Sequence, residues 1–296
     1  MSGTEAAKIR RLPPWLGKNI PAETGRPLID CLAELRLDTV CRGARCPNRL
    51  ECLSRGQAAF LILGPRCTRA CRFCAVESGN PEPPDPGEPF RLAEAVKRLG
   101  LAHAVITSVT RDDLSDGGAG HFARTAAAIR SRCPGVAVEI LVPDFSGNPE
   151  AWRTAADCRP EVFNHNLETV ARLYPGVRPG ADFDRSLALL GFAKRRRPGV
   201  TTKSGLMLGL GEDFREVREA AGALRRAGVD MLTVGQYLRP AGGRALPVER
   251  FVPPEEFADL ERELRGLGFA GVACSPFTRS SYRAGESFGA VSGRED

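Results

Sequence analysis

Short apolar runs alternate with amphipathic stretches along most of the chain. Between two such runs, Val217, Ala221 and Leu224 repeat on one helical face and Gly228 ends the pattern, which is typical of a surface helix. Apolar or β-branched runs of strand length predict strands at 58–63, 104–109, 136–142, 162–166, 202–208, 230–236 and 269–273. Strand followed by helix, repeated about six times, predicts an α/β fold whose parallel sheet is joined by helical crossovers.

The number of strand and helix units bears on the architecture. About six units are fewer than the eight of a complete barrel, so we expect a partial (β/α)6 TIM-like barrel, with a doubly wound sheet as the alternative. Both architectures place functional residues at the carboxyl ends of the strands. Roughly the first 35 residues, which include Pro13, Pro14 and Pro21, predict an irregular arm before the first unit.

Composition narrows the function classes. The 296 residues are 42% hydrophobic and 26% charged, and no apolar run reaches membrane-spanning length, so we expect a soluble protein without a membrane partner. The formal net charge of +6 favours an acidic partner, but three Tyr and two Trp give little support for nucleic-acid binding. Since the N-terminus carries no apolar signal sequence, we expect a cytoplasmic location, where clustered cysteines commonly bind metal.

Three cysteines follow the first predicted strand. Cys67, Cys71 and Cys74 form a C-x3-C-x2-C motif on a loop at the expected functional edge. A structural zinc site requires four ligands, whereas a 4Fe–4S cluster held by three cysteines leaves one iron free to bind a small molecule. The asymmetric spacing favours an iron–sulfur cluster over zinc or buried thiols.

This loop, with Phe73 before the third cysteine, resembles the radical S-adenosylmethionine (SAM) superfamily. The resemblance implies that the open iron binds the amino and carboxylate groups of SAM. It further implies that reduction of the cluster cleaves SAM to a 5′-deoxyadenosyl radical. Such a radical takes hydrogen from an unactivated carbon, which acid–base side chains cannot do, so the cofactor carries the difficult chemistry.

A second group of three cysteines precedes the first. Cys41, Cys46 and Cys52 form a C-x4-C-x5-C motif, and an R-S-S-Y motif lies near the C-terminus at 279–282. In this order, the three motifs resemble the lipoyl synthase family. The resemblance implies an auxiliary 4Fe–4S cluster on the earlier cysteines, with a serine of R-S-S-Y as its fourth ligand. Ser281 is the expected ligand, and the neighbouring Ser280 is the alternative.

The resemblance covers nearly the whole chain, from Leu12 to Gly285. It divides the chain into an N-terminal extension with the auxiliary-cluster cysteines (1–56), the radical SAM partial barrel (57–273) and a C-terminal segment with R-S-S-Y (274–296). Candidate SAM contacts after the predicted strands offer close backbone approach, hydrogen bonds or a positive charge: Gly117, Gly118, Asn164, Asn166, Glu168 and Lys203, with Arg111 as a further candidate for binding a carboxylate.

The resemblance also implies a reaction. The cluster on the C-x3-C-x2-C cysteines reduces SAM, and the radical takes hydrogen in turn from C6 and C8 of an octanoyl chain attached to a lysine. The auxiliary cluster donates a sulfur atom at each carbon. The expected partners are octanoylated lipoyl carrier domains, such as the glycine cleavage H protein or 2-oxoacid dehydrogenase E2 subunits, and an electron donor such as ferredoxin or flavodoxin.

Three departures from the family pattern concern the surroundings of the motifs. Arg42 and Gly43 stand where acidic residues are usual, Ala245 where a histidine is frequent, and Ser275 where glycine is common.

Two alternative functions remain. One is another radical SAM sulfur-inserting enzyme, such as a tRNA methylthiotransferase, which is expected to carry an added basic RNA-binding domain. The other is a noncatalytic metal-binding protein.

The remaining cysteines and two histidines are expected to be structural. Neither His103 nor His121 has a cysteine or carboxylate at ligand spacing. Four cysteines outside both groups are expected to be small buried side chains: Cys31, Cys133, Cys158 and Cys274.

Overall fold

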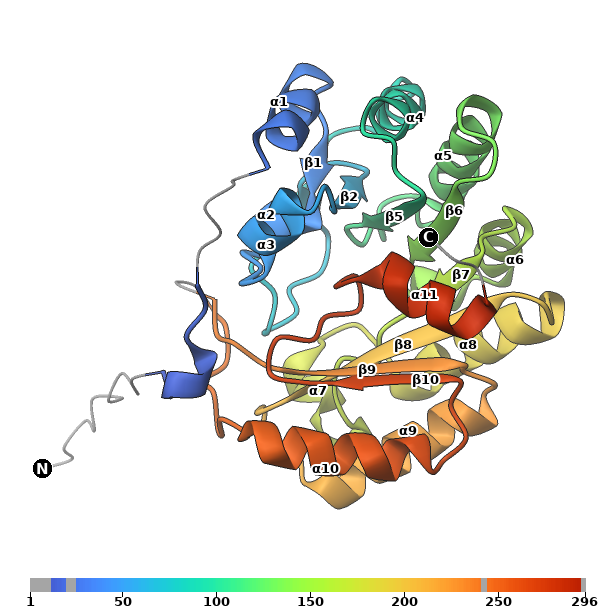
Figure 1. The fold of residues 1–296 in the computed structure, drawn as a ribbon. Helices are drawn as coiled ribbons and strands as arrows, with labels where there is room; N and C mark the ends of the chain where they lie inside the picture. Colours follow the sequence, from blue (N-terminus) through green and yellow to red (C-terminus); the bar gives the residue numbers. More distant parts are fainter. Residues whose placement is uncertain (1–11, 20–24, 241–243, 294–296) are drawn as a thin grey trace, which may run out of the picture.

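A sheet of eight strands forms the centre of the molecule (Figure 1). The computed structural model describes residues 12–19, 25–240 and 244–293. The strands, in their order across the sheet, are β1 (Asp38–Thr39), β2 (Ala59–Ile62), β5 (His103–Ser108), β6 (Ala137–Leu141), β7 (Val162–Asn164), β8 (Thr201–Leu208), β9 (Met231–Gln236) and β10 (Gly271–Cys274). Strands β3 (Arg66–Cys67) and β4 (Glu77–Ser78) form a small separate sheet.

The strand order decides between the two expected architectures. Strand β1 pairs antiparallel with β2, and every later neighbour pair is parallel and in chain order. A doubly wound sheet would reverse its strand order at a switch point. The partial barrel is therefore confirmed, with β10 as an additional parallel strand. Within the described ranges no pairing joins β10 to β1, so the barrel is open on that side.

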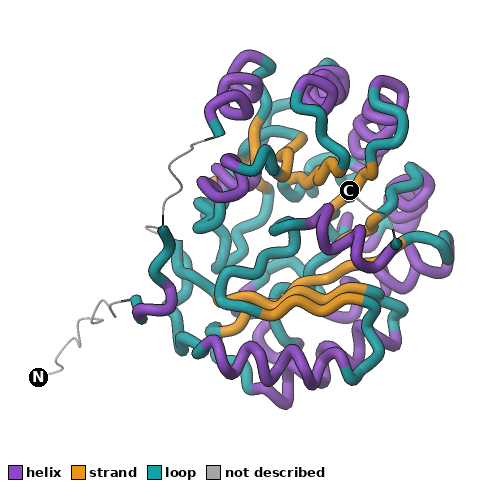
Figure 2. Tube along the Cα trace, viewed as in Figure 1, coloured by secondary structure: helices purple, strands orange, loops and turns teal. Residues whose placement is uncertain are grey.

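Six long helices alternate with strands of the sheet in the described chain. Figures 1 and 2 show that helices cover the outer face of the sheet. Their starts carry the expected local signals: Asp213 and Glu216 form a capping box, and the Asn148 side chain caps the helix after it. The basic run 194–196 lies in the last turn of its helix. The six are α4 (Glu88–Arg98), α5 (Ala119–Arg132), α6 (Pro149–Asp157), α8 (Phe183–Arg196), α9 (Phe214–Arg226) and α10 (Pro254–Arg265).

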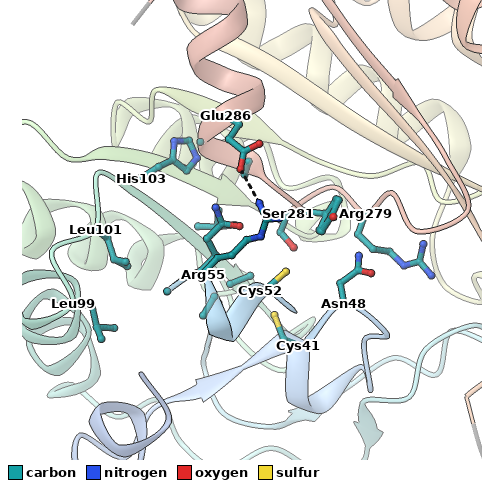
Figure 3. A pocket seen from close by; sticks show the side chains of 18 of the residues that line it. Cys41, Asn48, Cys52, Arg55, Leu99, Leu101, His103, Arg279, Ser281 and Glu286 are labelled. Carbon is teal, nitrogen blue, oxygen red and sulfur yellow. Dashed lines mark ion pairs between the residues drawn. The ribbon is translucent and has the colours of Figure 1, made fainter. Parts of the chain in front are cut away.

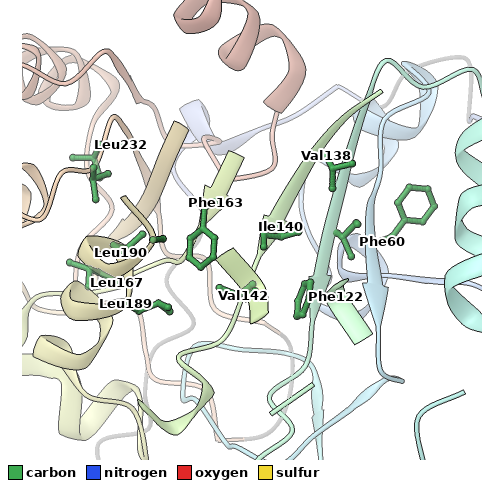
Figure 4. Packing of buried hydrophobic residues seen from close by; sticks show 14 of the residues in the cluster. Phe60, Phe122, Val138, Ile140, Val142, Phe163, Leu167, Leu189, Leu190 and Leu232 are labelled. Atoms are coloured by element: carbon green, nitrogen blue, oxygen red, sulfur yellow. The ribbon is translucent and has the colours of Figure 1, made fainter. Parts of the chain in front are cut away.

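The main hydrophobic core lies between the sheet and these helices (Figure 4). Along β6, Val138 and Ile140 pack outward in this core, whereas Glu139 and Leu141 alternate to the inner face. The interior of the barrel is polar near its middle. There the buried Lys203 Nζ lies 3.1 Å from Glu139 Oε1. At the carboxyl ends of the strands, the inner face of the sheet therefore lines a cavity.

The N-terminal region differs from the expected arm. Residues Arg26–Glu34 form helix α1, whose Leu28 and Leu32 are buried. Strand β1 then extends the sheet, and two short helices follow, α2 (Val40–Gly43) and α3 (Arg49–Ser54). The arm prediction was wrong here because only a few apolar residues mark α1, too few for a strong helical pattern. A 3-10 turn covers Pro14–Leu16, and the parts of the arm at 1–11 and 20–24, with Pro21, lie outside the described residues.

Three shorter elements complete the chain. Helix α7 (Tyr174–Val177) follows a 3-10 turn at Ala171–Leu173, and another turn covers Phe145–Gly147. Helix α11 (Ala284–Ser292) packs Phe288 against Ala137 and Val162, at the amino ends of two strands. No helix among the described residues is long and apolar enough to cross a membrane.

The expected burial is confirmed for Cys31 and Cys274, whereas Cys133 and Cys158 are half-buried. Each of the two histidines contacts a carboxylate that the sequence pattern did not indicate. All ten cysteines are free, and the four outside the two motifs belong to or pack against the main core. His121 Nε2 lies 2.8 Å from Glu88 Oε2 in the buried interior. His103 Nε2 lies 3.1 Å from Glu139 Oε2. Both rings therefore have structural partners.

Candidate functional site

The loop with Cys67, Cys71 and Cys74, here called the first trio, follows β2 and is anchored by Arg69. The Arg69 guanidinium donates two hydrogen bonds to Asp112, at 2.7 and 2.9 Å, and lies 2.8 Å from Asp144. Burial would raise the pKa of Asp144, but hydrogen bonds and charge from Arg69 outweigh it and lower the pKa to about 2. The loop is thus tied to the loops after β5 and β6 by charge-assisted hydrogen bonds.

Backbone N–H groups donate hydrogen bonds to two of the three sulfur atoms of the first trio. The N–H groups of Thr110 and Arg69 donate to Cys67 Sγ at 3.3 and 3.4 Å. The N–H of Val76 donates to Cys74 Sγ at 3.4 Å. Hydrogen bonds to sulfur stabilise thiolates and tune the potential of a cluster that they hold. The same N–H groups would stabilise the thiolates of a bound cluster.

The structure brings both cysteine groups to one cavity at the carboxyl ends of the strands. This main cavity has a volume of about 560 Å³. Its wall contains the whole first trio and also Cys41 and Cys46 of the second trio, which is Cys41, Cys46 and Cys52. Segments separated in sequence therefore share one reaction space.

A second cavity, of about 270 Å³, adjoins the second trio (Figure 3). All three of its thiols, Cys41, Cys46 and Cys52, line this space. Ser281 lines both cavities, as Cys41 and Cys46 do. The second trio thus forms part of the partition between the two cavities.

Contacts between the N-terminal and C-terminal regions place Ser281 there. The Asn48 side chain donates to the carbonyl of Phe277 at 2.6 Å, and the Tyr282 hydroxyl donates to Glu51 Oε1 at 2.6 Å. Lys18 adds an ion pair to Glu51 at 2.7 Å. These contacts bridge the open side of the barrel and flank the R-S-S-Y motif on both sides.

The two neighbouring serines have different surroundings. Ser280 Oγ accepts a hydrogen bond from Asn166 Nδ2 at 3.1 Å. In the described part of the chain, the Ser281 hydroxyl has no hydrogen-bond partner. Of the two, Ser281 therefore has the oxygen that is free to bind a metal beside the second trio.

The thiols fit an iron–sulfur cluster better than a single ion. Burial, with smaller contributions from the other thiols of the same trio, raises the pKa of Cys52 and of Cys74 to about 12. The thiols of each trio are therefore within electrostatic reach of one another. Yet no three His, Cys, Asp or Glu side chains in the described ranges are arranged to hold one metal ion. In a 4Fe–4S cube each thiolate binds a different iron, so the thiolates stand farther apart than around zinc.

The structure separates the candidate SAM contacts into two groups. Asn166 and Glu168 line the main cavity, and burial raises the pKa of the Glu168 carboxyl against the opposing charge of Arg178. Lys203 and Asn164 do not line it. Both instead contact the buried carboxylate of Glu139, at 3.1 and 2.9 Å.

The two candidate glycines and Arg111 also lie away from the lining of the main cavity. Gly117 and Gly118 have positive φ angles of 57° and 91°, just before α5. A Cβ on Gly118 would lie 2.3 Å from the Leu63 side chain, so its role is close packing. Arg111 is buried and bonds to Asp113 and to the Leu63 carbonyl.

Sequence reasoning missed two polar residues of the main cavity. His165 Nδ1 donates to the Val142 carbonyl at 2.7 Å, which leaves Nε2 as an acceptor, and this buried atom has no partner among the described residues. Arg178 lines the same cavity with its Nε also unpartnered. Unpaired buried polar atoms are costly unless a ligand binds them. His165 could have been found from its place near the end of the predicted strand at 162–166, whereas Arg178 lies in no strand-end pattern.

Comparisons with known proteins agree with this geometry. Residues 61–235 match the family model described as the Radical SAM superfamily. The chain is 53% identical over 278 residues to a lipoyl synthase from Trichlorobacter lovleyi, which covers 94% of this chain and 98% of the relative. It is 52% identical over 275 residues to a lipoyl synthase from Rubrobacter xylanophilus, with coverage of 93% and 85%.

Solved structures support the fold alone. A crystal structure of methylornithine synthase has a TM-score of 0.53 at 17% identity and covers 87% of this chain and 88% of that chain. Streptococcus suis SuiB bound to S-adenosylmethionine has a TM-score of 0.56 at 12% identity, with coverage of 72% and 49%.

Proposed function

Because the chain belongs to the lipoyl synthase family of radical SAM enzymes, we propose that its two cysteine trios divide the sulfur-insertion reaction between them. The substrate is an octanoyl chain on a carrier-domain lysine, and sulfur is inserted at C6 and C8. The proposal rests mainly on the observation that the whole first trio, Cys41 and Cys46 of the second trio, and Ser281 line the main cavity. Residues from the N-terminal extension (1–56), the barrel (57–273) and the C-terminal segment (274–296) would then act on one substrate.

The first trio would hold the cluster that binds SAM, and this cluster supplies the electron that cleaves SAM. Around it, this chain offers polar groups for a charged nucleoside ligand. Arg178 provides a positive charge for a carboxylate, while His165 Nε2 and the Asn166 Oδ1 atom are unpartnered acceptors for hydroxyl or amino hydrogens. Glu168 is a further acceptor in the same wall.

The second trio and Ser281 would hold the auxiliary cluster, which supplies the sulfur atoms. A serine oxygen is a harder ligand than a thiolate and matches iron–sulfur chemistry less well. We infer that the bond between the Ser281 oxygen and iron would break more easily than a thiolate–iron bond when the cluster loses sulfur. The absence of a hydrogen bond on the Ser281 hydroxyl in the described ranges supports its assignment as the ligand.

The main cavity suits an apolar chain beside a polar cofactor. Its volume of about 560 Å³ falls in the usual range for small-molecule sites. Apolar side chains from several elements, including Leu61, Val76, Leu141 and Met207, line part of it. Such a wall would hold an octanoyl chain in contact with both trios while excluding water.

The partners follow from the same proposal. The substrate would arrive on an octanoylated carrier domain, such as the glycine cleavage H protein or a 2-oxoacid dehydrogenase E2 subunit. Electrons would come from a small redox protein such as ferredoxin or flavodoxin. The excess of positive charge would favour acidic partners of both kinds.

An anaerobic assay tests the division of labour. The loaded chain is supplied with an octanoylated lysine peptide, SAM and a reductant, and products are identified by mass spectrometry. We expect Cys41→Ala to abolish formation of the dithiolane product while 5′-deoxyadenosine still forms, because only the second trio is damaged.

Cys133→Ala is the matched control, since this cysteine lies outside both trios and packs against the main core. It should retain both products. Full sulfur insertion by Cys41→Ala would show that the second trio is not the sulfur source, and loss of 5′-deoxyadenosine from that variant would show that the trios do not act separately.

A further inference from the structure

The second cavity gives the second trio a face that the main cavity does not share. Cys41, Cys46 and Ser281 line both cavities, whereas Cys52 lines only the second. The first trio, in turn, lines only the main cavity. The two cavities therefore adjoin at the second trio, and only the main cavity also reaches the first trio.

The second cavity runs from the surface to buried thiols. Its rim includes the exposed residues Arg55, Ala102 and Glu286, while Cys41 and Cys52 at its inner end are buried. The walls come from α3, from the turn between α4 and β5, and from the segment that leads into α11. Figure 3 shows these elements around the cysteine side chains. The cavity thus lies near the amino ends of β2 and β5.

The walls of the second cavity suit a small polar ligand. Buried His103 Nδ1 has no hydrogen-bond partner in the described ranges, although the other ring nitrogen contacts Glu139. Arg279 and Arg55 add positive charge along the same space, and Glu286 at the rim is the opposing carboxylate. A small anion would meet the positive charge of the arginines on its way to the thiols. Because the His103 Nε2–H faces Glu139, Nδ1 is an acceptor and could take a hydrogen bond from the S–H of hydrosulfide.

We propose that the second cavity is a separate access route by which small inorganic ligands, hydrosulfide above all, reach the second trio without passing through the main cavity. The need for such a route rests on the proposed function, in which two sulfur atoms leave the auxiliary cluster in each product. Hydrosulfide carries sulfur at the oxidation level of a cluster sulfide. Its incorporation forms an iron–sulfur bond and releases one proton, with no electron gained or lost.

A weak ion pair spans the rim of this route. Arg55 on α3 lies 3.9 Å from Glu286 on α11, and both side chains are nearly half exposed, at 46% and 45%. Exposed pairs of this length contribute little to stability. The rim can therefore open at low cost, and substitutions there should change access without unfolding the chain.

Timed alkylation of the full chain before cluster loading tests the route. Iodoacetamide is the probe, and mass spectrometry of peptides reports the labelling rates of Cys52 and Cys71 separately. The variant Ala102→Trp fills the exposed rim, and Arg55→Ala removes the pair across it. The controls are Ala258→Trp, at an exposed position on α10, and Arg218→Ala, which breaks the comparably exposed pair with Glu263.

We expect Ala102→Trp to slow labelling of Cys52 by about tenfold, since access then requires local opening, while labelling of Cys71 stays unchanged. Arg55→Ala should accelerate labelling of Cys52 alone, and both controls should match the unaltered chain. Equal rates for Cys52 in all variants would overturn the proposal. So would parallel changes at Cys52 and Cys71, because both thiols would then share one route.

A second measurement connects the route to sulfide. In a chain with the first trio replaced by alanine, anaerobic addition of ferrous iron and sulfide should build the auxiliary cluster, followed by absorbance. Ala102→Trp should slow this step several-fold and Ala258→Trp should not. Neither measurement requires octanoyl substrate, so a failure here is distinguishable from a failure of the proposed reaction. An unchanged rate in Ala102→Trp would show that sulfide enters elsewhere.

Discussion

The two adjacent serines of the R-S-S-Y motif differ in their hydrogen bonds, and this difference decides which of them is expected to bind iron. Ser280 is held by Asn166, whereas the Ser281 hydroxyl is unbonded within the described chain and lies beside the second trio. We expect Ser281→Ala to abolish sulfur insertion while 5′-deoxyadenosine still forms, because the auxiliary cluster loses its fourth protein ligand. Mössbauer spectra of the loaded variant should show a changed iron site in that cluster.

Ser280→Ala is the neighbouring control. It removes a hydroxyl that accepts one neutral hydrogen bond, so it should keep most of the sulfur insertion and leave the Mössbauer spectrum unchanged. If Ser280→Ala rather than Ser281→Ala alters the iron site, the ligand assignment must be exchanged.

His165 should make stability depend on pH. Burial, together with the charge of Arg178, lowers its pKa from 6.5 to about 4. Between these pH values the unfolded chain binds a proton that the folded chain does not, so stability falls as pH falls. The contribution of the neutral His165 ring to the free energy of unfolding is complete above pH 6.5, and about 3 kcal/mol of this contribution is lost by pH 4.

Urea unfolding at several pH values measures this dependence. The free energy of unfolding of the unaltered chain should decline more steeply between pH 6.5 and 4 than that of His165→Asn, which lacks the imidazole. Above pH 7 the two curves should run parallel. Curves that stay parallel down to pH 4 would mean that the buried ring accepts its proton in the folded state.

At the residue scale, the sequence predicts site residues correctly where the spacing within a motif identifies the chemistry. The cysteine motifs and R-S-S-Y are local patterns, and the structure brings both trios and Ser281 together. The sequence predicts a residue's role less well where several partners are available to its side chain in the fold. Lys203 was expected to hold a carboxylate of a ligand, but it contacts the buried carboxylate of Glu139, which is 64 residues away in sequence.

The Lys203 and Glu139 pair joins β8 to β6 inside the barrel, so it belongs to the scale of elements. Both side chains are almost completely buried. We expect Lys203→Met to destabilise the fold by about 3–5 kcal/mol, because it leaves a buried carboxylate without its cation. Unfolding in denaturant measures the loss.

The double variant Lys203→Met with Glu139→Gln removes both charges and should recover much of that stability. Its affinity for SAM, measured by equilibrium dialysis on the loaded chain, should match that of the unaltered chain. A folded double variant that no longer binds SAM would instead place Lys203 among the SAM contacts.

The elements themselves could be predicted where burial is continuous. Strands such as β8 and β9 are buried along nearly their whole length, and their expected ranges agree closely with the structure. Helix α1 and strand β1 could not, since β1 has only two residues and gains its stability from pairing with β2. Such tertiary contacts leave no periodic pattern in the sequence.

At the scale of the whole molecule, positive charge gathers beside the mouth of the main cavity. Arg239 lines the cavity and Arg72 follows Cys71, and both side chains are exposed. Neither forms an ion pair with a carboxylate within the described ranges. An acidic carrier domain could therefore pair with both while its octanoyl arm enters the cavity.

Kinetics with two substrates tests this docking. The double variant Arg72→Gln with Arg239→Gln should raise KM several-fold for an acidic octanoylated carrier domain and leave KM for a short octanoylated lysine peptide unchanged. Added salt should weaken carrier binding less in the variant than in the unaltered chain. Arg226→Gln, at an exposed position on α9, should behave like the unaltered chain. If the double variant and the unaltered chain had equal KM values for the carrier domain, docking would not involve these two arginines.

The central claim is that one fold holds two separate iron–sulfur cubes, each on its own trio. Iron and sulfide analysis after anaerobic loading tests it most directly. The account predicts about eight irons and eight sulfides per chain, and about four of each when either trio alone is replaced by alanine. Bound zinc, or loss of all iron on replacing a single trio, would contradict it.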